Sequence, residues 1–165
     1  MKAQMESETK PPDQSQPDQS KKAKQPKQSL TAVRLRKHAD FQRAYADSRK
    51  RQSASMSWFL APGEARDQRS GIRDQGAVAN ARVGLTAGKV LGKAHERNLI
   101  KRRMREALRR HLDLLPEGAD LILHPRRAVL TMEFAKLEAE LVRILTQARA
   151  DAAKAASRAR MVSRP

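Results

Sequence analysis

Regular apolar periodicity is confined to residues 30–148, and this limits how much of the chain can fold. The first 29 residues are rich in Gln, Lys, Ser and Pro and hold only four apolar side chains, without periodic spacing. Such a segment cannot bury enough surface to offset the entropy of ordering it. Residues 149–165 contain the good helix formers Ala and Arg but present no apolar face. We therefore expect one domain over 30–148, a disordered tail over 1–29, and a frayed or disordered basic tail over 149–165.

Helical spacing of apolar residues occurs in three segments of this domain: the second half of 30–48, residues 95–115, and residues 131–148. Asp40 favours a helix start in the first segment, because a carboxylate stabilises the first turn of a helix. The third segment carries one apolar stripe from Phe134 to Ala148, with Thr131 as its expected N-cap.

Short apolar runs typical of strands occupy residues 56–61, 81–87 and 120–124. In the first run we expect Trp58 in the core and Phe59 on the opposite face of the strand. The polar stretch 62–80 is longer than usual connections, which indicates an inserted loop. With one further strand, which the pattern does not locate, between the first two, these elements predict the α+β class: a small α-β sandwich with a mixed sheet of three to four strands, in the order α-β-β-β-α-β-α.

The predicted domain carries most of a large positive charge. The chain has 35 Lys and Arg against 18 Asp and Glu, a net charge of +17, and residues 30–148 hold 24 of the bases and 13 of the acids. A field of this size attracts polyanions, most commonly nucleic acid. Cysteine is absent, which excludes disulfide scaffolds and thiol nucleophiles. Since no signal peptide or membrane span is recognisable, we expect a soluble, cytoplasmic protein without a membrane partner.

Residues 97–110 place seven cations on one predicted helix, with Glu106 as the only acid. At about 100° per residue, these cations separate into rows away from the apolar face. The first row comprises Arg102, Arg105 and Arg109 together with the neutral Asn98, and the second comprises Arg103 and Arg110. A merely solvated face would set acids four residues from such cations. Because guanidinium groups match phosphate oxygens, we interpret the rows as a phosphate-binding surface, with a solvated charge run as the alternative.

Further cations surround the start of this helix. Arg97 and Lys101 point towards its apolar arc, and we expect them to project past the edge of the sheet. Lys89 and Lys93 precede the helix, whose free N–H groups and positive dipole end offer a second anion site. The glycine-containing run before it lacks the spacing of a nucleotide-binding P-loop.

No catalytic or metal-binding constellation is recognisable in the sequence. The four histidines are scattered without metal-ligand spacing, and the acids form no obvious pair. We therefore predict no catalytic residue and no protein-held metal, and expect the chain to serve any reaction by binding.

The sequence between residues 82 and 106 resembles the signature of the bacterial ribonuclease P protein component. The resemblance rests on RVGLT-x-GK-x-x-GKA at 82–94, followed by RN-x-x-KR-x-x-RE at 97–106. The second motif alone is a weak signal, whereas the two in succession are specific. Other segments agree: Asp40-Phe41 with Tyr45 resembles the family's first helix, residues 57–59 its aromatic strand, and residues 120–123 its last strand. The resemblance spans roughly residues 30–148.

Membership of this family implies a fold similar to domain 2 of ribosomal protein S5, with a left-handed crossover. It also implies a subunit of an endoribonuclease whose RNA is the catalyst, so that the protein alone is inactive. The holoenzyme removes the 5′ leader of precursor tRNA with bound Mg²⁺, and the implied partners are ribonuclease P RNA and precursor tRNA, with no small-molecule substrate. The residues implied to meet the catalytic RNA are Lys89, Lys93, Arg97, Asn98, Lys101, Arg102, Arg103, Arg105 and Arg109.

The resemblance also implies a cleft that holds the single-stranded leader, lined by Phe41, Tyr45 and Phe59. Aromatic stacking on single-stranded bases contributes ~1–3 kcal/mol per base. The alternative is that the three rings are ordinary core residues. Lys93 stands where the family usually has Asn in a context linked to metal binding, and a charged Lys cannot ligate Mg²⁺. We therefore expect Mg²⁺ to be bound mainly by the RNA subunit.

Two other classes share the strong positive charge. One is a structural RNA-binding protein, such as a ribosomal or assembly factor, and the other is a DNA-compacting protein. The second would carry heavier basic tails and a less structured middle, whereas here the domain holds most of the charge. The joint motif favours the ribonuclease P subunit over both.

Overall fold

The computed structural model describes residues 29–63 and 81–162. Most of the predicted tail 1–29 and of the predicted loop 62–80 therefore lies outside the described residues. The helices and strands are α1 (His38–Ala46), β1 (Arg51–Gln52), β2 (Met56–Pro62), β3 (Arg82–Leu85), α2 (Ala94–Arg110), β4 (Ala119–Pro125) and α3 (Phe134–Val162). Short 3-10 turns follow three of them, at Lys89–Leu91, Leu112–Leu114 and Arg127–Leu130.

The strands form one mixed sheet in the order β1-β2-β4-β3. β2 pairs antiparallel with β4, with Trp58 opposite Leu123, and β3 pairs parallel with β4. The segment before α1 lies along the free edge of β3: the Leu35 N–H donates to Val83 O at 2.9 Å, and the Val83 N–H to Val33 O at 2.7 Å. The predicted α+β class with a mixed sheet is confirmed. The two-residue strand β1 was not predicted, because so short a run has no periodicity to detect.

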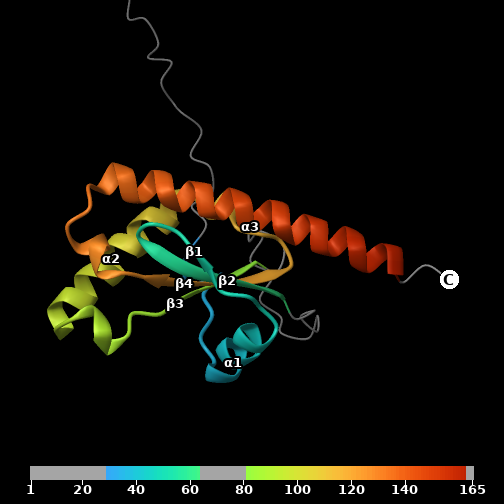
Figure 1. Ribbon diagram of the computed structural model, residues 1–165, viewed down its shortest axis with the longest axis horizontal. Coiled ribbons are helices and arrows are strands. Elements are labelled where there is room, and N and C mark those ends of the chain that lie inside the picture. Colours follow the sequence, from blue (N-terminus) through green and yellow to red (C-terminus); the bar gives the residue numbers. More distant parts are fainter. Residues whose placement is uncertain (1–28, 64–80, 163–165) are drawn as a thin grey trace, which may run out of the picture.

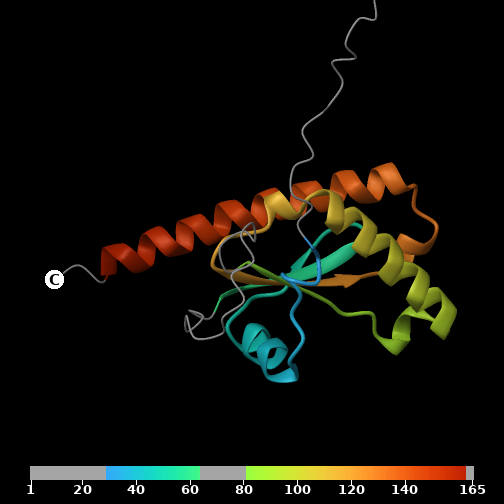
Figure 2. The same ribbon diagram turned by 180° about the vertical axis from the view of Figure 1, so that it is seen from behind.

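Strand alternation divides the apolar side chains between two cores on opposite faces of the sheet. α2 and α3 cover one face and α1 lies against the other (Figures 1 and 2). Trp58, 2% exposed, belongs to the larger core under α2 and α3. Phe59 packs against the smaller core under α1, which consists of Leu35, Ala44, Ala61 and Ile122. The predicted opposite orientation of Trp58 and Phe59 is therefore confirmed.

The basic helix α2 ends earlier than the predicted residue 115. The α-helix stops at Arg110, and the chain continues as a 3-10 turn through Leu114. Leu115 has an extended backbone, with φ −59° and ψ 140°, as expected of a residue before proline, here Pro116. Leu112 and Leu115 are nevertheless buried, so the apolar pattern that extended the prediction reflects core packing beyond the helix.

Helix α3 starts and ends later than predicted. The Leu137 N–H donates to Glu133 O at 3.1 Å, so the first turn closes on Glu133. Thr131 lies at the end of the preceding 3-10 turn, and its prediction as N-cap is wrong. The helix continues to Val162, so the prediction of a frayed or disordered tail is wrong for residues 149–162. A helix already docked on the core needs no new nucleus, and Ala and Arg extend it at little cost.

Candidate nucleic-acid interface

The faces of α2 separate as the periodicity predicted. Its buried residues are Ile100, Met104, Ala107 and Leu108. The opposite row, Asn98, Arg102, Arg105 and Arg109, is exposed throughout. The amphipathic pattern therefore docks the helix on the larger core and directs a row of cations to solvent.

Part of the cationic surface is neutralised within the chain, contrary to expectation. Arg109 Nη1 lies 3.1 Å from Glu106 Oε2, and Arg110 contacts both Glu106 at 3.5 Å and Glu138 at 3.3 Å. The expectation of uncompensated rows is thus wrong for these two arginines. Both side chains remain more than half exposed, so the pairs are weak and open to exchange for phosphate.

Arg103 has a structural role that the sequence did not indicate. Its Nη1 donates to Leu130 O at 2.7 Å and its Nη2 to Met132 O. These carbonyls belong to the connection between β4 and α3, so Arg103 fastens that connection to α2. The second predicted row is therefore largely engaged with the protein itself.

Arg102 and Arg105 keep their charge available. Both are exposed, and neither side chain makes an ion pair or hydrogen bond with any other described residue. They lie three residues apart and so point from the same side of α2. This pair is the part of the predicted phosphate-binding row that the chain leaves uncompensated.

The start of α2 is built around Gly92 and Glu96. Gly92 has φ +122°, and a side chain there would also meet Glu96 Oε2 at 2.1 Å. That carboxylate accepts the Lys93 N–H at 2.7 Å and pairs with Arg127 at 2.9 Å. One donor of the predicted second anion site is therefore already taken by the chain's own acid. Lys89 and Lys93 are exposed beside it.

Arg97 and Lys101 are both partly buried in the first turns of α2. Arg97 Nε is buried and has no hydrogen-bond partner in the described part of the chain. Figures 1 and 2 show these turns reaching past the sheet, towards the side on which α1 lies. The start of α2 thus lies beyond the sheet, and the projection of the Arg97 and Lys101 side chains stays a prediction.

The predicted cleft aromatics come together on the α1 face. The Tyr45 ring lies 6.5 Å from Phe41 and 5.0 Å from Phe59, centroid to centroid, the latter edge to face. All three are partly buried against the smaller core. Phe41 lies directly on Gly84 of β3, where an added Cβ would sit 2.6 Å from the Phe41 ring. The three residues are thus packed against the core and also partly exposed. The structure therefore lies between the leader-binding cleft and the ordinary core that the sequence left open.

His124 completes this aromatic group and was missed by sequence reasoning. Its Nε2 lies 2.7 Å from Tyr45 Oη, and its ring centroid lies 5.6 Å from Tyr45 and 5.2 Å from Phe59. Burial, together with the charge of Lys50, lowers the pKa of His124, so the ring is held neutral. Strand alternation could have predicted this position, because Ile122 and His124 are two residues apart and must share one face of β4.

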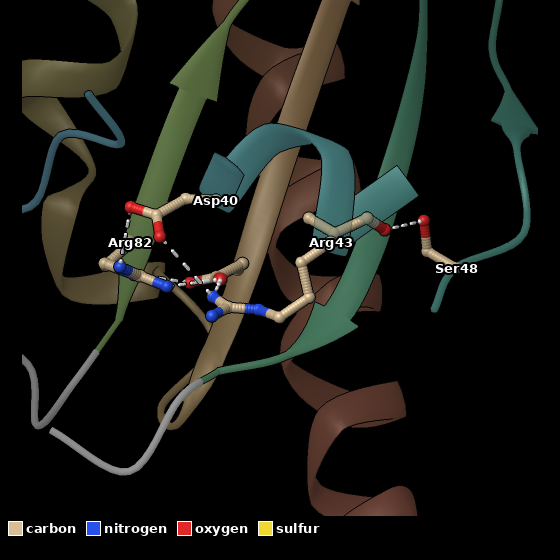
Figure 3. Close-up of polar contacts among 6 residues, drawn as sticks. Asp40, Arg43, Ser48 and Arg82 are labelled. Carbon is tan, nitrogen blue, oxygen red and sulfur yellow. Dashed lines mark hydrogen bonds and ion pairs between the residues drawn. The ribbon is translucent and has the colours of Figure 1, made fainter. Parts of the chain in front are cut away.

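Four charged side chains fasten α1 to the first residues of β3 and β4 (Figure 3). Arg82 donates to Asp120 from Nε at 2.7 Å and from Nη2 at 2.6 Å. Arg43 of α1 donates to the same carboxylate at 3.0 Å, and Arg82 Nη1 reaches Asp40 at 3.2 Å. The hydrogen bond to Asp120 raises the pKa of Arg82. Asp120 is fully buried, so this network sets where α1 and its aromatic residues sit.

The described residues contain no group of three or more His, Cys, Asp or Glu side chains able to hold a metal ion. Lys93 likewise offers no lone pair in its charged form. In this part of the chain, the residues therefore do not fit a protein-held Mg²⁺. Within the same part of the chain, no helix is long and apolar enough to cross a membrane.

Known proteins with similar sequence and fold identify the family. A family model described as Ribonuclease P matches residues 31–149. A ribonuclease P protein component from Chloroflexus aggregans is 37% identical over 118 residues, which cover 71% of this chain and 78% of that protein. One from Thermobifida fusca is 31% identical, covering 66% of this chain and 70% of the relative.

Solved structures agree with this assignment. The RNase P protein of Staphylococcus aureus superposes with a TM-score of 0.56 at 25% identity, over 71% of this chain and 95% of that one. That of Thermotoga maritima gives a TM-score of 0.55 at 24% identity, over 69% and 96%, and supports the fold. The chain therefore belongs to the family of ribonuclease P protein components, parts of a tRNA-processing enzyme.

Proposed function

We propose that this chain binds ribonuclease P RNA through the exposed side of α2 and the 5′ leader of precursor tRNA through the α1 face. The RNA is the catalyst, and the protein raises the affinity for substrate in a magnesium-dependent cleavage of the leader. The proposal includes a cytoplasmic location, as for an enzyme that processes newly made transcripts. The observation that carries it is the pair Arg102 and Arg105, exposed and without an ion pair in the described part of a family member.

Electrostatics support this use of α2. Guanidinium groups that no carboxylate offsets repel one another and gain from a phosphate backbone. Arg109 adds a third cation, because its pair with Glu106 is exposed and exchangeable. Arg103 contributes less than its place in the motif implies, since two of its nitrogens serve carbonyl oxygens.

The α1 face has the chemistry to hold a single strand. Phe41, Tyr45 and Phe59 are each partly exposed. Tyr45 Oη, which lies 3.4 Å from Thr86 Oγ1, and the neutral His124 ring offer hydrogen bonds next to these rings. Stacking surfaces beside a few polar groups suit unpaired bases without strong sequence preference.

Magnesium enters the proposal as an ion bound by the RNA. It would supply charge neutralisation and an activated water at the scissile phosphate. This chain's own part is to hold RNA and leader together, and Lys93 would place its ammonium near a phosphate instead of a metal ion.

The test is reconstitution of the full-length protein with a bacterial ribonuclease P RNA at low magnesium, with cleavage of precursor tRNA as the readout. We expect the protein to stimulate cleavage and to be inactive without the RNA. Absence of stimulation, together with binding to this RNA no tighter than to a random duplex, would favour a structural RNA-binding protein.

A further inference from the structure

The C-terminal part of α3 extends well beyond the body of the protein. The last buried residue of the helix is Ala148, and every side chain from Ala153 to Met161 is exposed. From Ala148 to Val162 the helix rises roughly 20 Å, at ~1.5 Å per residue. Figures 1 and 2 show this end projecting past the sheet, away from α2. We call residues 150–162 the α3 arm; the family model ends at residue 149, just before it.

The base of the α3 arm is fixed to the body, and its backbone favours a rigid helix. Asp151 forms an ion pair with Arg51 of β1. The Arg51 guanidinium in turn lies 4.9 Å from the Trp58 ring centroid. The arm contains neither Gly nor Pro and is rich in Ala, so the docked part of α3 propagates into it.

The cations of the α3 arm have no counter-charge among the described residues. Lys154, Arg158 and Arg160 make no ion pair or hydrogen bond through their side chains with any described residue. The arm's one acid, Asp151, is already paired. The helix dipole accounts for a cation in the last turn, such as Arg160, but its influence does not reach Lys154, two turns from the end.

The distribution of these cations selects among acidic partners. Lys154 and Arg158 are one turn apart on the same side, whereas Arg160 lies nearly opposite. A membrane surface requires an apolar face opposite the charges, and the arm has none. Cations on two sides, separated by small alanines, suit a helix lying between two stretches of sugar-phosphate backbone.

We propose that the α3 arm is a second RNA-binding surface, which contacts backbone phosphates of structured RNA beyond the reach of α2. This inference rests on the proposed function, because it assumes an RNA partner. The phosphates could belong to the catalytic RNA or to precursor tRNA, and the chemistry of the contact is the same.

The test is a triple variant, Lys154→Gln with Arg158→Gln and Arg160→Gln, in the full-length protein. Binding is measured from 50 to 200 mM salt, first to ribonuclease P RNA and then, as assembled holoenzyme, to precursor tRNA. Three lost phosphate contacts lower the salt slope by about 2.7, so the affinity ratio of wild type to variant shrinks roughly 40-fold over this range. Far-UV circular dichroism verifies that the helix persists, since Gln is also a good helix former.

Two matched variants make the result interpretable. The charge-retaining variant Lys154→Arg with Arg158→Lys and Arg160→Lys should keep the wild-type slope. Arg102→Gln with Arg105→Gln removes cations from α2 and reports on the proposed function separately.

A reduced slope with ribonuclease P RNA assigns the arm to the catalytic RNA, and a reduced slope only with precursor tRNA assigns it to the substrate. An unchanged slope in both, while the α2 variant lowers it, overturns the inference and leaves the proposed function standing. If the α2 variant also leaves it unchanged, both fail. Equal loss in the charge-retaining variant overturns the inference as well.

Discussion

Replacing Asp120 by Asn tests how α1 is held on the sheet. The Asp120 carboxylate is fully buried and accepts three hydrogen bonds, two from Arg82 and one from Arg43. Asn keeps the size of the side chain but removes the negative charge and turns an amide donor towards guanidinium donors. The group of Arg43, Arg82, Asp40 and Asp120 is neutral overall. The change therefore leaves the two arginines without the carboxylate that they share.

The magnitude follows from the burial of the group. Removing one partner of a buried ion pair costs about 3–5 kcal/mol. The Arg82 and Arg43 side chains are 16% and 28% exposed, so water recovers part of the loss. We expect the free energy of unfolding to fall by about 3 kcal/mol. The matched control is Asp40→Asn, at the edge of the same network. It weakens the 3.2 Å hydrogen bond from Arg82, so we expect the free energy of unfolding to fall by about 1 kcal/mol.

The assay is urea unfolding followed by far-UV circular dichroism and by the fluorescence of Trp58, the one tryptophan of the chain. Coincident transitions establish two-state behaviour, and the midpoint should move by about 1.5 M for a slope near 2 kcal/mol/M. The double variant Arg82→Gln with Asp120→Asn should lose less free energy of unfolding than the sum of the two single changes. Each single change leaves the other side chain without its partner, and the double change leaves neither. A loss for Asp120→Asn no greater than for Asp40→Asn would refute the central role of this carboxylate.

Three further predictions concern α2 and the α1 face. Arg102→Ala with Arg105→Ala should lower the salt slope of RNA binding by about two, in filter-binding titrations, and an unchanged slope would contradict the assignment of this side of α2. Gly84→Val should destabilise the fold by at least ~2 kcal/mol in urea unfolding, because the new side chain takes the space of the Phe41 ring; a neutral effect would contradict this packing. The lowered pKa of His124 means that its contribution to stability is complete above the unfolded value of 6.5 and is lost as the pH falls below it. Between pH 7.5 and 5.5 the stability of wild type should therefore fall relative to His124→Gln, and parallel curves would argue against a neutral, partly buried ring.

Local periodicity predicted the parts of the molecule that local sequence controls. The buried and exposed sides of α2 follow from 3.6-residue spacing, and the opposite orientation of Trp58 and Phe59 follows from strand alternation. The partners of Arg103 could not be predicted in this way. They are backbone carbonyls 27 and 29 residues later, in an irregular connection whose position depends on the assembled fold.

The α1 face shows the same limit from another direction. The spacing of Phe41 and Tyr45 predicted that both lie on one side of α1. The pairing of Arg82 with Asp120 depends on the register between β3 and β4, which no local pattern encodes. The prediction for the α3 arm is wrong for a different reason. The arm has no apolar face, but a docked helix with good helix formers can continue without one.

The positive surface of this protein reflects where its acids are used as well as how few it has. Asp40 and Asp120 hold α1 on the sheet, and Glu96 closes the first turn of α2. Glu138 pairs with Arg110 and hydrogen-bonds His111 at the end of α2. Glu140 accepts the Ser55 N–H at 2.9 Å, which ties α3 to the turn before β2. These carboxylates are committed to contacts elsewhere, so they do not offset Arg102 and Arg105 of α2 or the cations of the α3 arm. Stability and RNA attraction therefore depend on the same distribution of charge: an acid lost from the interior weakens the fold, and one added on the surface weakens the field.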